Sequence, residues 1–562
     1  MLALAMGGGV FFWALARGRL LLYGDATAHL MIARRMFDSL TPGLSQWGTV
    51  WLPFPHLLTA PWVAIMALWR TGAAGSIVSV AAFAFAAYFL HRIAARHLGA
   101  AAAGWAAVFF VLNPNVLYLA AVPMTETVYL AAFLGAVDSI GRYRESGGAA
   151  QFPDAAPVGP HPSAARALGT PVRGCGPASL KAEFPDGNSL AGNGGPIRSG
   201  PLQVAATRAD RYVTSSALWA LAGAMTRYDG WFCLPFFALA IWAAGGWRAA
   251  WRFSAIAAIG PVFWFAYNFF YFGDALAFLR GPYSARQIYL EALRHGGFRY
   301  PGDHHLALAA LYYLKCATLD CGVPLLLLAA LGLGAWLLAR GRLVRAQAWP
   351  HALGSPPLLL LLPLPWYLWA MWSGNVPIFV PMYWPHGYYN LRYGVQLLPA
   401  AAFWSAAFIV YLCARQRRWR AGVVGGLALL ALFSYAVMLR GQGPMTYAEA
   451  VHNAPARLAM EHQLAAALAP RRRGDKLLMF LGSYPGALAD DGIALHDVIQ
   501  ESNFRIWDRA LAAPQDYAAW VVVQQGTLID REINHAALAR YFAPVASFSG
   551  PRQAPVTVWR ER

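Results

Sequence analysis

Long apolar stretches without charged residues recur along the chain, and they limit its fold more than any other feature. A helix needs about 20 consecutive apolar residues to cross the hydrocarbon core of a bilayer. Only 12% of the 562 residues are charged and 58% are hydrophobic, whereas a soluble domain has about 25% charged residues. The stretches that reach or approach the required length are 77–90 with its small flanking residues, 104–122, 253–272, 324–339 and 400–413. We therefore predict a mainly α-helical, polytopic integral membrane protein with about ten or eleven spans.

Basic residues between the apolar stretches predict the orientation. They cluster at 91–97, 142–144, 247–252, 340–345 and 415–420. Because positive loops stay in the cytoplasm, the alternating segments should lie outside: 23–56, 122–128, 225–231, 272–305, 374–397 and the chain after about 440. For these sides to alternate, segment 51–69 must be a re-entrant or interfacial helix, or one extra span.

The net charge of +18 is accounted for by these loops. A nucleic-acid-binding protein needs a solvated face of Lys and Arg that reaches phosphates. Here the arginines lie in short loops between apolar runs instead, so we expect no nucleic-acid partner.

Two segments depart from the membrane pattern. Residues 146–207 are rich in Gly, Pro, Ala and Ser and have no apolar periodicity, which predicts a disordered cytoplasmic loop. Residues 445–562 predict a small extracytoplasmic α/β domain that follows a membrane module of residues 1–440. Its expected strands are 476–481 and 519–523, its helices 456–468 and 533–541, and its closing hairpin 545–548 with 556–559. It has no P-loop or GxGxxG motif, so we expect an accessory or acceptor-binding module.

The first outer loop holds an acidic residue directly after the first apolar run. An ionisable group at the edge of hydrocarbon is costly and is therefore a functional candidate. Asp25 is followed by His29 four residues later, so both share one face of a helix. Asp25 could accept a proton from an acceptor hydroxyl, with His29 orienting it or the substrate. Alternatively, Asp25 caps a helix over 26–40.

Other ionisable groups are expected at the same depth. Alone, each could be an interfacial side chain reaching for water, or part of a local ion pair such as Arg227 with Asp229. Together, two acids and two arginines suit an anionic phosphate ligand held by Arg, beside carboxylates that act on a hydroxyl or a metal. The residues of this second set are Glu126, Arg227, Asp229, Arg392 and Tyr393.

The motif Gly24-Asp25-Ala26, with His29, Arg34 and Arg35 after it, resembles the first outer loop of the GT-C glycosyltransferases. These multi-span enzymes use polyprenyl- or dolichyl-phosphate sugars, and they include the protein O-mannosyltransferase and aminoarabinose-transferase branches. Four further segments resemble family motifs in the same order: Trp-Leu-Pro-Phe-Pro at 51–55, Pro-Met-Thr-Glu at 123–126, Thr-Arg-Tyr-Asp-Gly-Trp at 226–231, and Asn-Leu-Arg-Tyr at 390–393 with Leu-Pro at 398–399.

The resemblance covers about residues 1–440 and has two departures. The first loop has one acid, Asp25, where the mannosyltransferases have an Asp-Glu pair. No DxD motif is present, so dependence on a divalent metal stays open.

The resemblance implies an inverting transferase of hexosyl or mannosyl type on the outer side of a bacterial inner membrane. It would move a sugar from a polyprenyl-phosphate donor to an acceptor on a protein, lipid or glycan, and its donor tail would contact membrane lipid. Asp25 would be the general base, and Glu126 would support the acceptor or a divalent ion. The expected substrate-binding residues are His29, Arg34, Arg227, Asp229, Arg392 and Tyr393, with Arg392 and Arg227 on the phosphate.

Two other functions compete with this hypothesis. A lipid-linked-sugar flippase or transporter should have internal repeats and polar groups near the bilayer midplane. A non-catalytic anchor for the outer domain should have no need of Asp25, Glu126 and Arg392 in one place. The transferase hypothesis requires these residues to meet in one water-accessible site at the outer rim of the bilayer.

Overall fold

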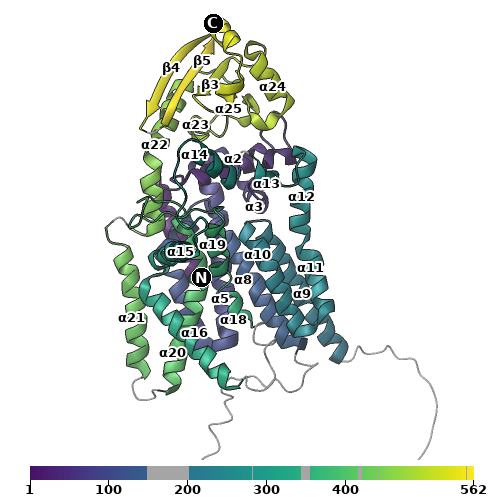
Figure 1. Cartoon of the computed structure of the whole chain (residues 1–562), viewed down its shortest axis with the longest axis vertical. Coiled ribbons are helices and arrows are strands. Elements are labelled where there is room, and N and C mark those ends of the chain that lie inside the picture. Colours follow the sequence, from purple (N-terminus) through teal and green to yellow (C-terminus); the bar gives the residue numbers. More distant parts are fainter. Residues whose placement is uncertain (149–200, 282, 344–354, 416–419, 442, 552) are drawn as a thin grey trace, which may run out of the picture.

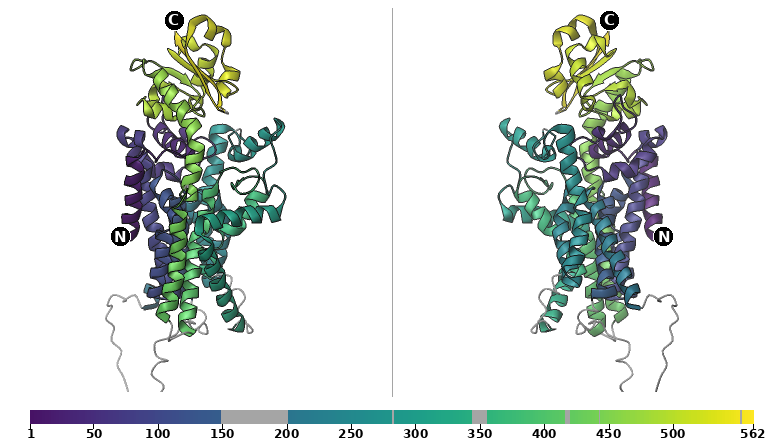
Figure 2. Two further views of the ribbon diagram at one scale, coloured as in Figure 1. Left: turned by 90° about the vertical axis from the view of Figure 1, so that its left-hand side faces the viewer. Right: turned by 90° about the vertical axis from the view of Figure 1, so that its right-hand side faces the viewer.

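The computed structural model describes residues 1–148, 201–281, 283–343, 355–415, 420–441, 443–551 and 553–562. A bundle of long helices carries a smaller domain with strands, the cap, at one end (Figure 1). Helix α22 (Met445–Leu468) extends from the side of the bundle into the cap, as two views at right angles also show (Figure 2). One helix thus joins the bundle to the cap, and the domain boundary expected at about residue 440 stays a prediction.

The bundle consists of helices from both halves of the chain. Its first half contains α1 (Leu2–Ala16), α5 (Ala73–Leu98), α6 (Ala100–Val111), α7 (Pro114–Ala121), α8 (Glu126–Tyr143), α9 (Pro201–Ala224), α10 (Tyr228–Gly245), α11 (Trp247–Ala257) and α12 (Ile259–Phe272). Its second half contains α15 (Leu306–Cys321), α16 (Val323–Leu343), α18 (Pro356–Leu359), α19 (Pro363–Trp372), the 3-10 segment η5 (Leu391–Leu397), α20 (Leu398–Arg415) and α21 (Arg420–Met438). Helix α8 packs between α5 and α9, and α16 packs along α20.

Within the described ranges, three helical segments are long and apolar enough to cross a membrane: Ala73–Leu98, Trp247–Phe272 and Leu391–Leu412. The number rises to five if the bent pairs α6 with α7 and α15 with α16 each count as one span. The polytopic membrane fold is therefore confirmed, while the total of ten or eleven spans stays a prediction.

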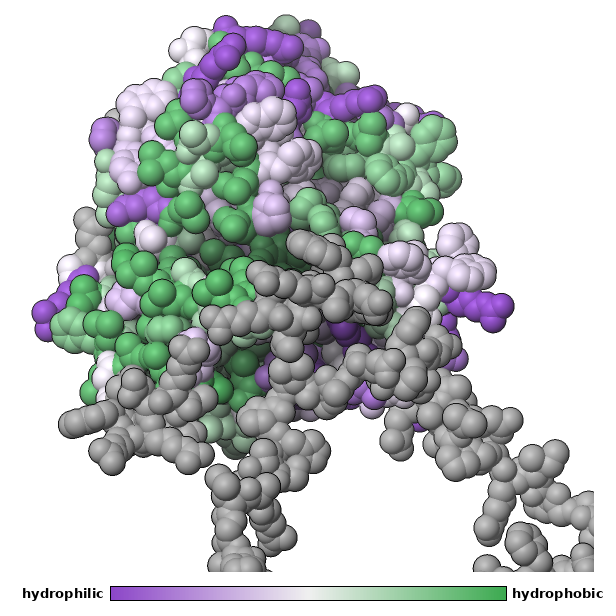
Figure 3. Space-filling model, turned by 60° about the horizontal axis from the view of Figure 1, so that its bottom comes forward, coloured by the Kyte–Doolittle hydropathy of each residue, from purple (hydrophilic) through white to green (hydrophobic). Residues whose placement is uncertain are grey.

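The surface of the bundle is apolar. Hydrophobic residues cover much of the flank visible in Figure 3, whereas hydrophilic ones gather toward the cap. Large side chains that are more than half exposed include Phe12, Trp251, Phe270, Leu338 and Phe433. Contiguous exposed apolar surface of this kind is suited to contact with lipid tails. The prediction of an integral membrane protein is confirmed.

Two of the basic clusters lie together at the end of α8 remote from Glu126. Arg92 and Arg96 of α5 lie 3.5 and 3.0 Å from the carboxylate of Asp138, and Arg142 lies 3.4 Å from it. Asp138 is buried, so three guanidinium groups share one buried carboxylate. This places the ends of α5 and α8 on the same side of the bundle, as the loop charges predict.

Short elements fill the space between the bundle and the cap. They are α2 (Gly24–Arg35), η1 (Leu44–Trp47), α3 (Phe54–Val63), α4 (Met66–Thr71), α13 (Ala277–Arg280) and α14 (Ala285–Arg294). Helices α3 and α4 have ten and six residues and are separated at Ala64 and Ile65. Segment 51–69 therefore contains two short helices, each too short to cross a bilayer as one straight span.

The cap is a five-stranded sheet with helices. The strands are β1 (Leu477–Met479), β2 (Val498–Ile499), β3 (Trp520–Gln524), β4 (Phe542–Gly550) and β5 (Gln553–Glu561), in the order β2-β1-β3-β5-β4. Strand β1 is parallel to β2 and β3, and β5 is antiparallel to β3 and β4. The helices are α23 (Gly486–Asp490), α24 (Arg505–Ala512), α25 (Leu528–Glu532) and α26 (His535–Tyr541), with 3-10 turns η6 (Leu495–Asp497), η7 (Glu501–Asn503) and η8 (Pro514–Asp516). The predicted α/β domain is confirmed, including its closing hairpin.

The cap is attached to the first outer loop by polar contacts. Asp38 accepts from the backbone N–H of His496 at 3.0 Å and lies 2.7 Å from its imidazole Nδ1. Gln46 accepts from Gln500 at 2.9 Å and donates to the carbonyl of Ser502 at 3.0 Å. Since these bonds join residues more than 450 positions apart, they fix the position of the cap over α2.

The predicted disordered loop 146–207 lies mainly outside the described residues. Its described flanks are helical: the single π-helical turn η2 (Arg144–Gly148) closes α8, and α9 begins at Pro201. The sequence pattern therefore placed the end of this loop several residues too late.

Candidate active site

Arg392 is the centre of a buried ion-pair cluster on the cap side of the bundle. Its Nη2 lies 2.5 Å from Asp25 Oδ2, its Nε 3.1 Å from Glu126 Oε1, and its Nη1 3.0 Å from Glu449 Oε1. Three helices, α2, α8 and α22, therefore each direct one carboxylate to the same guanidinium. Buried charges are tolerated only where they are paired and hydrogen-bonded, and here every nitrogen of the guanidinium has an acceptor.

Arg227 extends the cluster. Its Nη1 lies 3.3 Å from the same Glu126 oxygen that contacts Arg392, and its Nε lies 3.1 Å from Asp229. The third nitrogen, Nη2, donates to the hydroxyl of Tyr367 at 3.0 Å. The local Arg227–Asp229 ion pair considered from the sequence is thus present, and it belongs to the larger cluster.

The ring of Tyr393 lies between the two arginines. Its centroid is 4.7 Å from Cζ of Arg227 and 5.1 Å from Cζ of Arg392. The same ring also stacks on Tyr367, with ring centroids 5.3 Å apart. A cation beside an aromatic face is attracted by the ring quadrupole, so Tyr393 holds both guanidinium groups in place.

Glu449 fixes the backbone that carries Arg392. It accepts from the backbone N–H groups of Asn390 at 2.8 Å and Arg392 at 3.2 Å. Asn390 has a φ of +56°, a left-handed conformation that Asn tolerates better than most residues. Two residues after Arg392, a Cβ on Gly394 would lie 2.8 Å from the carbonyl carbon of Cys316. A side chain there would push η5 away from α15.

Glu449 is a cluster residue that was not predicted from the sequence. It lies beyond the expected domain boundary, on a helix assigned to the outer domain. Its side chain is 1% exposed, and burial raises its pKa, against the effect of Arg392. Its helix, α22, has polar residues along its whole length, so no signal in the sequence singles out Glu449.

Asp25 is the carboxylate of this cluster that is open to solvent. Its side chain is 37% exposed, whereas those of Glu126 and Glu449 are 1% exposed. Helix α2 begins at Gly24 with Tyr23 at its N-cap and has no side-chain capping bond. The alternative of Asp25 as a helix cap is therefore not realised, and its carboxylate contacts Arg392 instead.

His29 and Arg34 lie outside the ion-pair cluster. His29 Nδ1 is 3.0 Å from His56 Nε2, and its ring packs against Trp51 at 4.5 Å. Burial lowers the pKa of His29 to about 4, although Asp25 has the opposite effect, so the imidazole is neutral at neutral pH. Arg34 pairs with Asp38 at 2.8 Å and donates to the carbonyl of Val63 at 2.8 Å. Both residues stabilise the first outer loop rather than line the cluster.

The arrangement of donors argues against a resident divalent metal in the cluster. Oxygen Oε2 of Glu126 is buried without a hydrogen-bond partner, which is a feature of free metal ligands. However, Arg392 occupies the position between Asp25 and Glu126 that a bridging cation would need. Over the described part of the chain, no three His, Cys, Asp or Glu side chains are grouped as metal ligands. We therefore derive no metal-dependent step.

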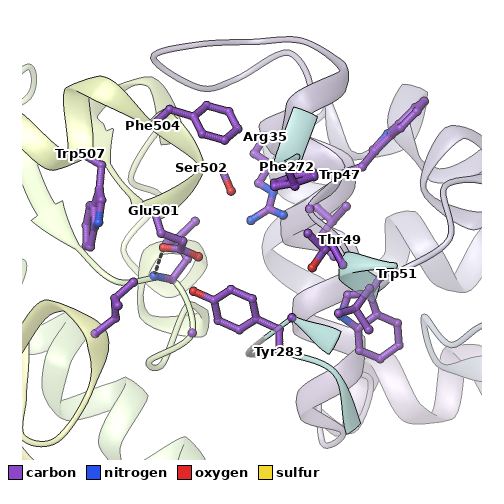
Figure 4. Close-up of a pocket in the computed structure, with 18 of the residues that line it drawn as sticks. Arg35, Trp47, Thr49, Trp51, Phe272, Tyr283, Glu501, Ser502, Phe504 and Trp507 are labelled. Carbon is purple, nitrogen blue, oxygen red and sulfur yellow. Dashed lines mark hydrogen bonds between the residues drawn. The ribbon is translucent and has the colours of Figure 1, made fainter. Parts of the chain in front are cut away.

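A cavity of about 630 Å³ lies beside the cluster, between the outer elements and the cap (Figure 4). Ala28, Ile32 and Arg35 of α2 line it. These residues follow Asp25 by three, seven and ten positions, so all four share one helical face. The cavity thus begins about one helical turn from Asp25 and leads toward the cap.

Comparisons with known proteins identify the fold. No family profile and no curated protein matches by sequence. ArnT from Cupriavidus metallidurans bound to undecaprenyl phosphate has a similar structure, with a TM-score of 0.55, 14% identity, and coverage of 99% of this chain and 97% of that one. The apo state of the same protein has a TM-score of 0.50 and 12% identity, and the match covers 95% of this chain and 93% of that one. The Archaeoglobus fulgidus oligosaccharyltransferase tethered to an acceptor peptide has a TM-score of 0.45 and 9% identity, and the match covers 94% of this chain and 69% of that one. The chain therefore has a fold similar to that of ArnT over nearly its whole length, a helical membrane bundle followed by an α/β domain.

Proposed function

We propose that this protein is an inverting glycosyltransferase that uses a polyprenyl-phosphate sugar as donor. The observation that carries the proposal is the convergence of Asp25, Glu126, Arg227 and Arg392 from four distant segments into one cluster that is open to solvent at Asp25. Polar residues that only anchored helix ends would have no reason to meet. The similar fold of ArnT, whose structure contains undecaprenyl phosphate, supports the choice of donor.

The donor phosphate would bind at Arg392 and replace Asp25 there. Arg392 is already paired with three carboxylates, and the Asp25 contact is the one that reaches solvent. Glu126 and Glu449 would keep the guanidinium in position while the phosphate takes the vacated side. Donor binding would therefore free the Asp25 carboxylate from its ion pair, so that it can contact the acceptor hydroxyl.

In the transfer step, the acceptor oxygen attacks C1 of the sugar from the side opposite the phosphate. Asp25 takes the hydroxyl proton as the new O–C1 bond forms, and the bond from C1 to the phosphate oxygen breaks. The leaving polyprenyl phosphate keeps the electron pair, and Arg392 and Arg227 stabilise its negative charge. Attack from the opposite face inverts the configuration at C1. An acceptor amine would be positioned by Asp25 in the same place.

The proposed reaction takes place on the extracytoplasmic side of a bacterial inner membrane. The basic loop ends at Arg92, Arg96 and Arg142 lie at the other end of α8 from the cluster, which supports a cytoplasmic position for those loops. A membrane setting also suits the donor, because its polyprenyl tail requires contact with lipid. Transfer of a hexosyl or mannosyl group remains our expectation for the sugar.

The test is mass spectrometry of cell-envelope glycans from cells without the gene, complemented with wild type, Asp25→Asn or Glu291→Gln. Glu291 is an exposed carboxylate of α14 outside the cluster and is the matched control. We expect one defined sugar to disappear on deletion, and to return with wild type and Glu291→Gln but not with Asp25→Asn. Immunoblots of membranes verify that each variant is inserted at wild-type level. Restoration of the sugar by Asp25→Asn would refute the catalytic assignment.

A further inference from the structure

A groove of about 820 Å³ runs along α9 on the flank of the bundle. The residues of α9 that line it recur at positions 210–211, 214–215, 218–219 and 222. Because residues four apart on a helix lie above one another, these positions form one continuous stripe, about 18 Å long. The hydrocarbon of one bilayer leaflet is about 15 Å thick, half of the core. The groove therefore has the length of an acyl chain in one leaflet.

The middle of the groove is apolar. The hydroxyl of Thr214 donates to the carbonyl of Asp210 at 3.0 Å. The hydroxyl of Ser215 lies 3.1 Å from that of Ser139, so both hydroxyl groups are already hydrogen-bonded within the protein. The remaining lining residues toward the cap are Leu218, Trp219, Ala222 and Phe54. This part of the groove is suited to a hydrocarbon chain.

The floor of the groove is held in place by neighbouring helices. The indole of Trp219 lies against α8, where a Cβ added to Gly135 would be 2.7 Å from it. The ring of Phe89 on α5 contacts the same indole, with ring centroids 5.1 Å apart. At the end toward the cap, the backbone N–H of Phe54 donates to the carbonyl of Met225 at 3.0 Å. The groove is therefore closed toward the cap and has a fixed floor.

The end of the groove remote from the cap carries a net positive charge. Two arginines line it, Arg211 and Arg252, against one carboxylate, Asp210. Asp210 pairs with Arg252 at 3.0 Å, and among the described side chains no carboxylate lies within 4.0 Å of Arg211. A third arginine reaches the same turn of α9, since Cζ of Arg142 is 5.4 Å from the ring centroid of Tyr212. An anion at this end would meet arginines that its single carboxylate does not neutralise.

We propose that the groove binds one anionic phospholipid of the leaflet remote from the cap, with its phosphate at Arg211 and Arg252 and one acyl chain along the α9 stripe. Arginine binds phosphate oxygens through paired N–H donors. Basic pockets between membrane helices on the cytoplasmic side bind anionic lipid headgroups, and the loop charges assign this end of the bundle to the cytoplasm. The two arginines lie at the end of α9 remote from Arg227, so the site is separate from the proposed transferase chemistry and does not depend on it.

The test is native mass spectrometry of the full-length protein in detergent micelles, titrated with phosphatidylglycerol or with phosphatidylcholine of the same acyl chains. Wild type should bind its first phosphatidylglycerol about fivefold or more tightly than phosphatidylcholine, because only the former carries a net negative charge. Arg211→Gln should lower this ratio toward one. Arg248→Gln is the matched control and should keep the wild-type ratio. Arg248 is an exposed arginine of the same helix as Arg252, lies beside Trp247, and does not line the groove.

Two further probes test the acyl chain and the identity of the lipid. Glycerol 3-phosphate has the phosphate without the chains, so an equal concentration of it should leave phosphatidylglycerol bound. Polyprenyl phosphate should also leave it bound, because its phosphate is assigned to the cluster at the other end of α9. Ala222→Trp places a large ring in the apolar part of the groove. It should weaken binding of both phospholipids by a similar factor and leave their ratio unchanged.

Four results would overturn the inference. Equal binding of the two phospholipids by wild type would remove the role of charge, and this comparison requires no variant to fold. An equal loss of preference in Arg211→Gln and Arg248→Gln would show a general attraction to the basic surface in place of a site. Displacement by glycerol 3-phosphate would reduce the groove to an anion site without a chain. Displacement by polyprenyl phosphate would assign the groove to the tail of the donor.

Discussion

Two arginines on the cap side of the bundle are almost equally buried but have opposite surroundings. Arg392 is 6% exposed and Arg35 is 8% exposed. Arg392 has three carboxylates within 3.1 Å, whereas Arg35 has none within 4.0 Å among the residues the structure describes. The first is held rigidly and can accept a ligand only by exchanging a partner. The second faces Glu501 of the cap across the cavity, so we assign the proposed chemistry to Arg392 and not to Arg35.

The largest effect is expected from removing the one solvent-exposed partner of Arg392. Asp25→Asn should lower the rate of sugar transfer by about 10²–10⁴-fold, the usual contribution of a general base. Its affinity for polyprenyl phosphate should stay the same or increase, because no carboxylate then competes for Arg392. Single-turnover transfer and lipid binding, measured on one purified sample, check both parts. A parallel loss of lipid binding would instead indicate that Asp25 only supports the structure.

A smaller effect is expected from removing a buried partner. Glu449→Gln leaves Arg392 with two carboxylates and weakens the anchoring of residues 390–392, so transfer should fall about tenfold to a hundredfold while Tm decreases by several degrees. Glu461→Gln on the same helix is the matched control, since Glu461 is also buried and paired, at 2.6 Å from Arg457. It should lower Tm similarly without changing transfer per folded molecule. Equal activity losses in both variants would contradict a positioning role for Glu449.

The aromatic contact between the two cluster arginines should matter less. Tyr393→Leu removes a cation–π contact worth about 1–2 kcal/mol when desolvated, which corresponds to roughly a fivefold to thirtyfold increase in KM for the donor. Tyr393→Phe keeps the ring and should remain near wild type. A large loss in Tyr393→Phe would show that the hydroxyl, and not the ring, is required.

The smallest effect is expected on the pH dependence of stability, and it comes from His29 of α2. This buried imidazole has a folded pKa of about 4, below the usual value of about 6.5. The unfolded state therefore binds more protons between these values, so stability is complete above pH 6.5 and decreases as the pH falls toward 4. Thermal melts from pH 7 to 4.5 should show this decrease, with a shallower slope in His29→Gln. Identical slopes in the two proteins would exclude His29 as its source.

Much of the ion-pair cluster could be predicted from the sequence because charges beside long apolar runs are conspicuous. Asp25, Glu126, Arg227 and Arg392 each interrupt or border such a run. Glu449 could not be found this way, because α22 has polar residues throughout and its first turns reach back into the bundle. Which carboxylate contacts which nitrogen depends on packing between residues up to 367 positions apart.

The first outer loop shows a different limit. The family resemblance predicts Arg34 as a substrate-binding residue, yet Arg34 pairs with Asp38 four residues later. Spacing of four residues on a helix favours such a pair, which could have indicated that Arg34 is neutralised. The cap was predicted correctly in outline, since β1 and β3 are short, nearly continuous apolar runs. The cavity beneath it was not, because two separate parts of the chain form its walls.

The most direct test of the account is the affinity of polyprenyl phosphate for the wild type, Arg392→Gln and Asp25→Asn, measured by native mass spectrometry in detergent micelles. We predict that Arg392→Gln weakens binding by about tenfold or more, and that Asp25→Asn binds at least as tightly as wild type. Wild-type affinity in Arg392→Gln, with the protein folded, would contradict the assignment of the donor phosphate to this cluster.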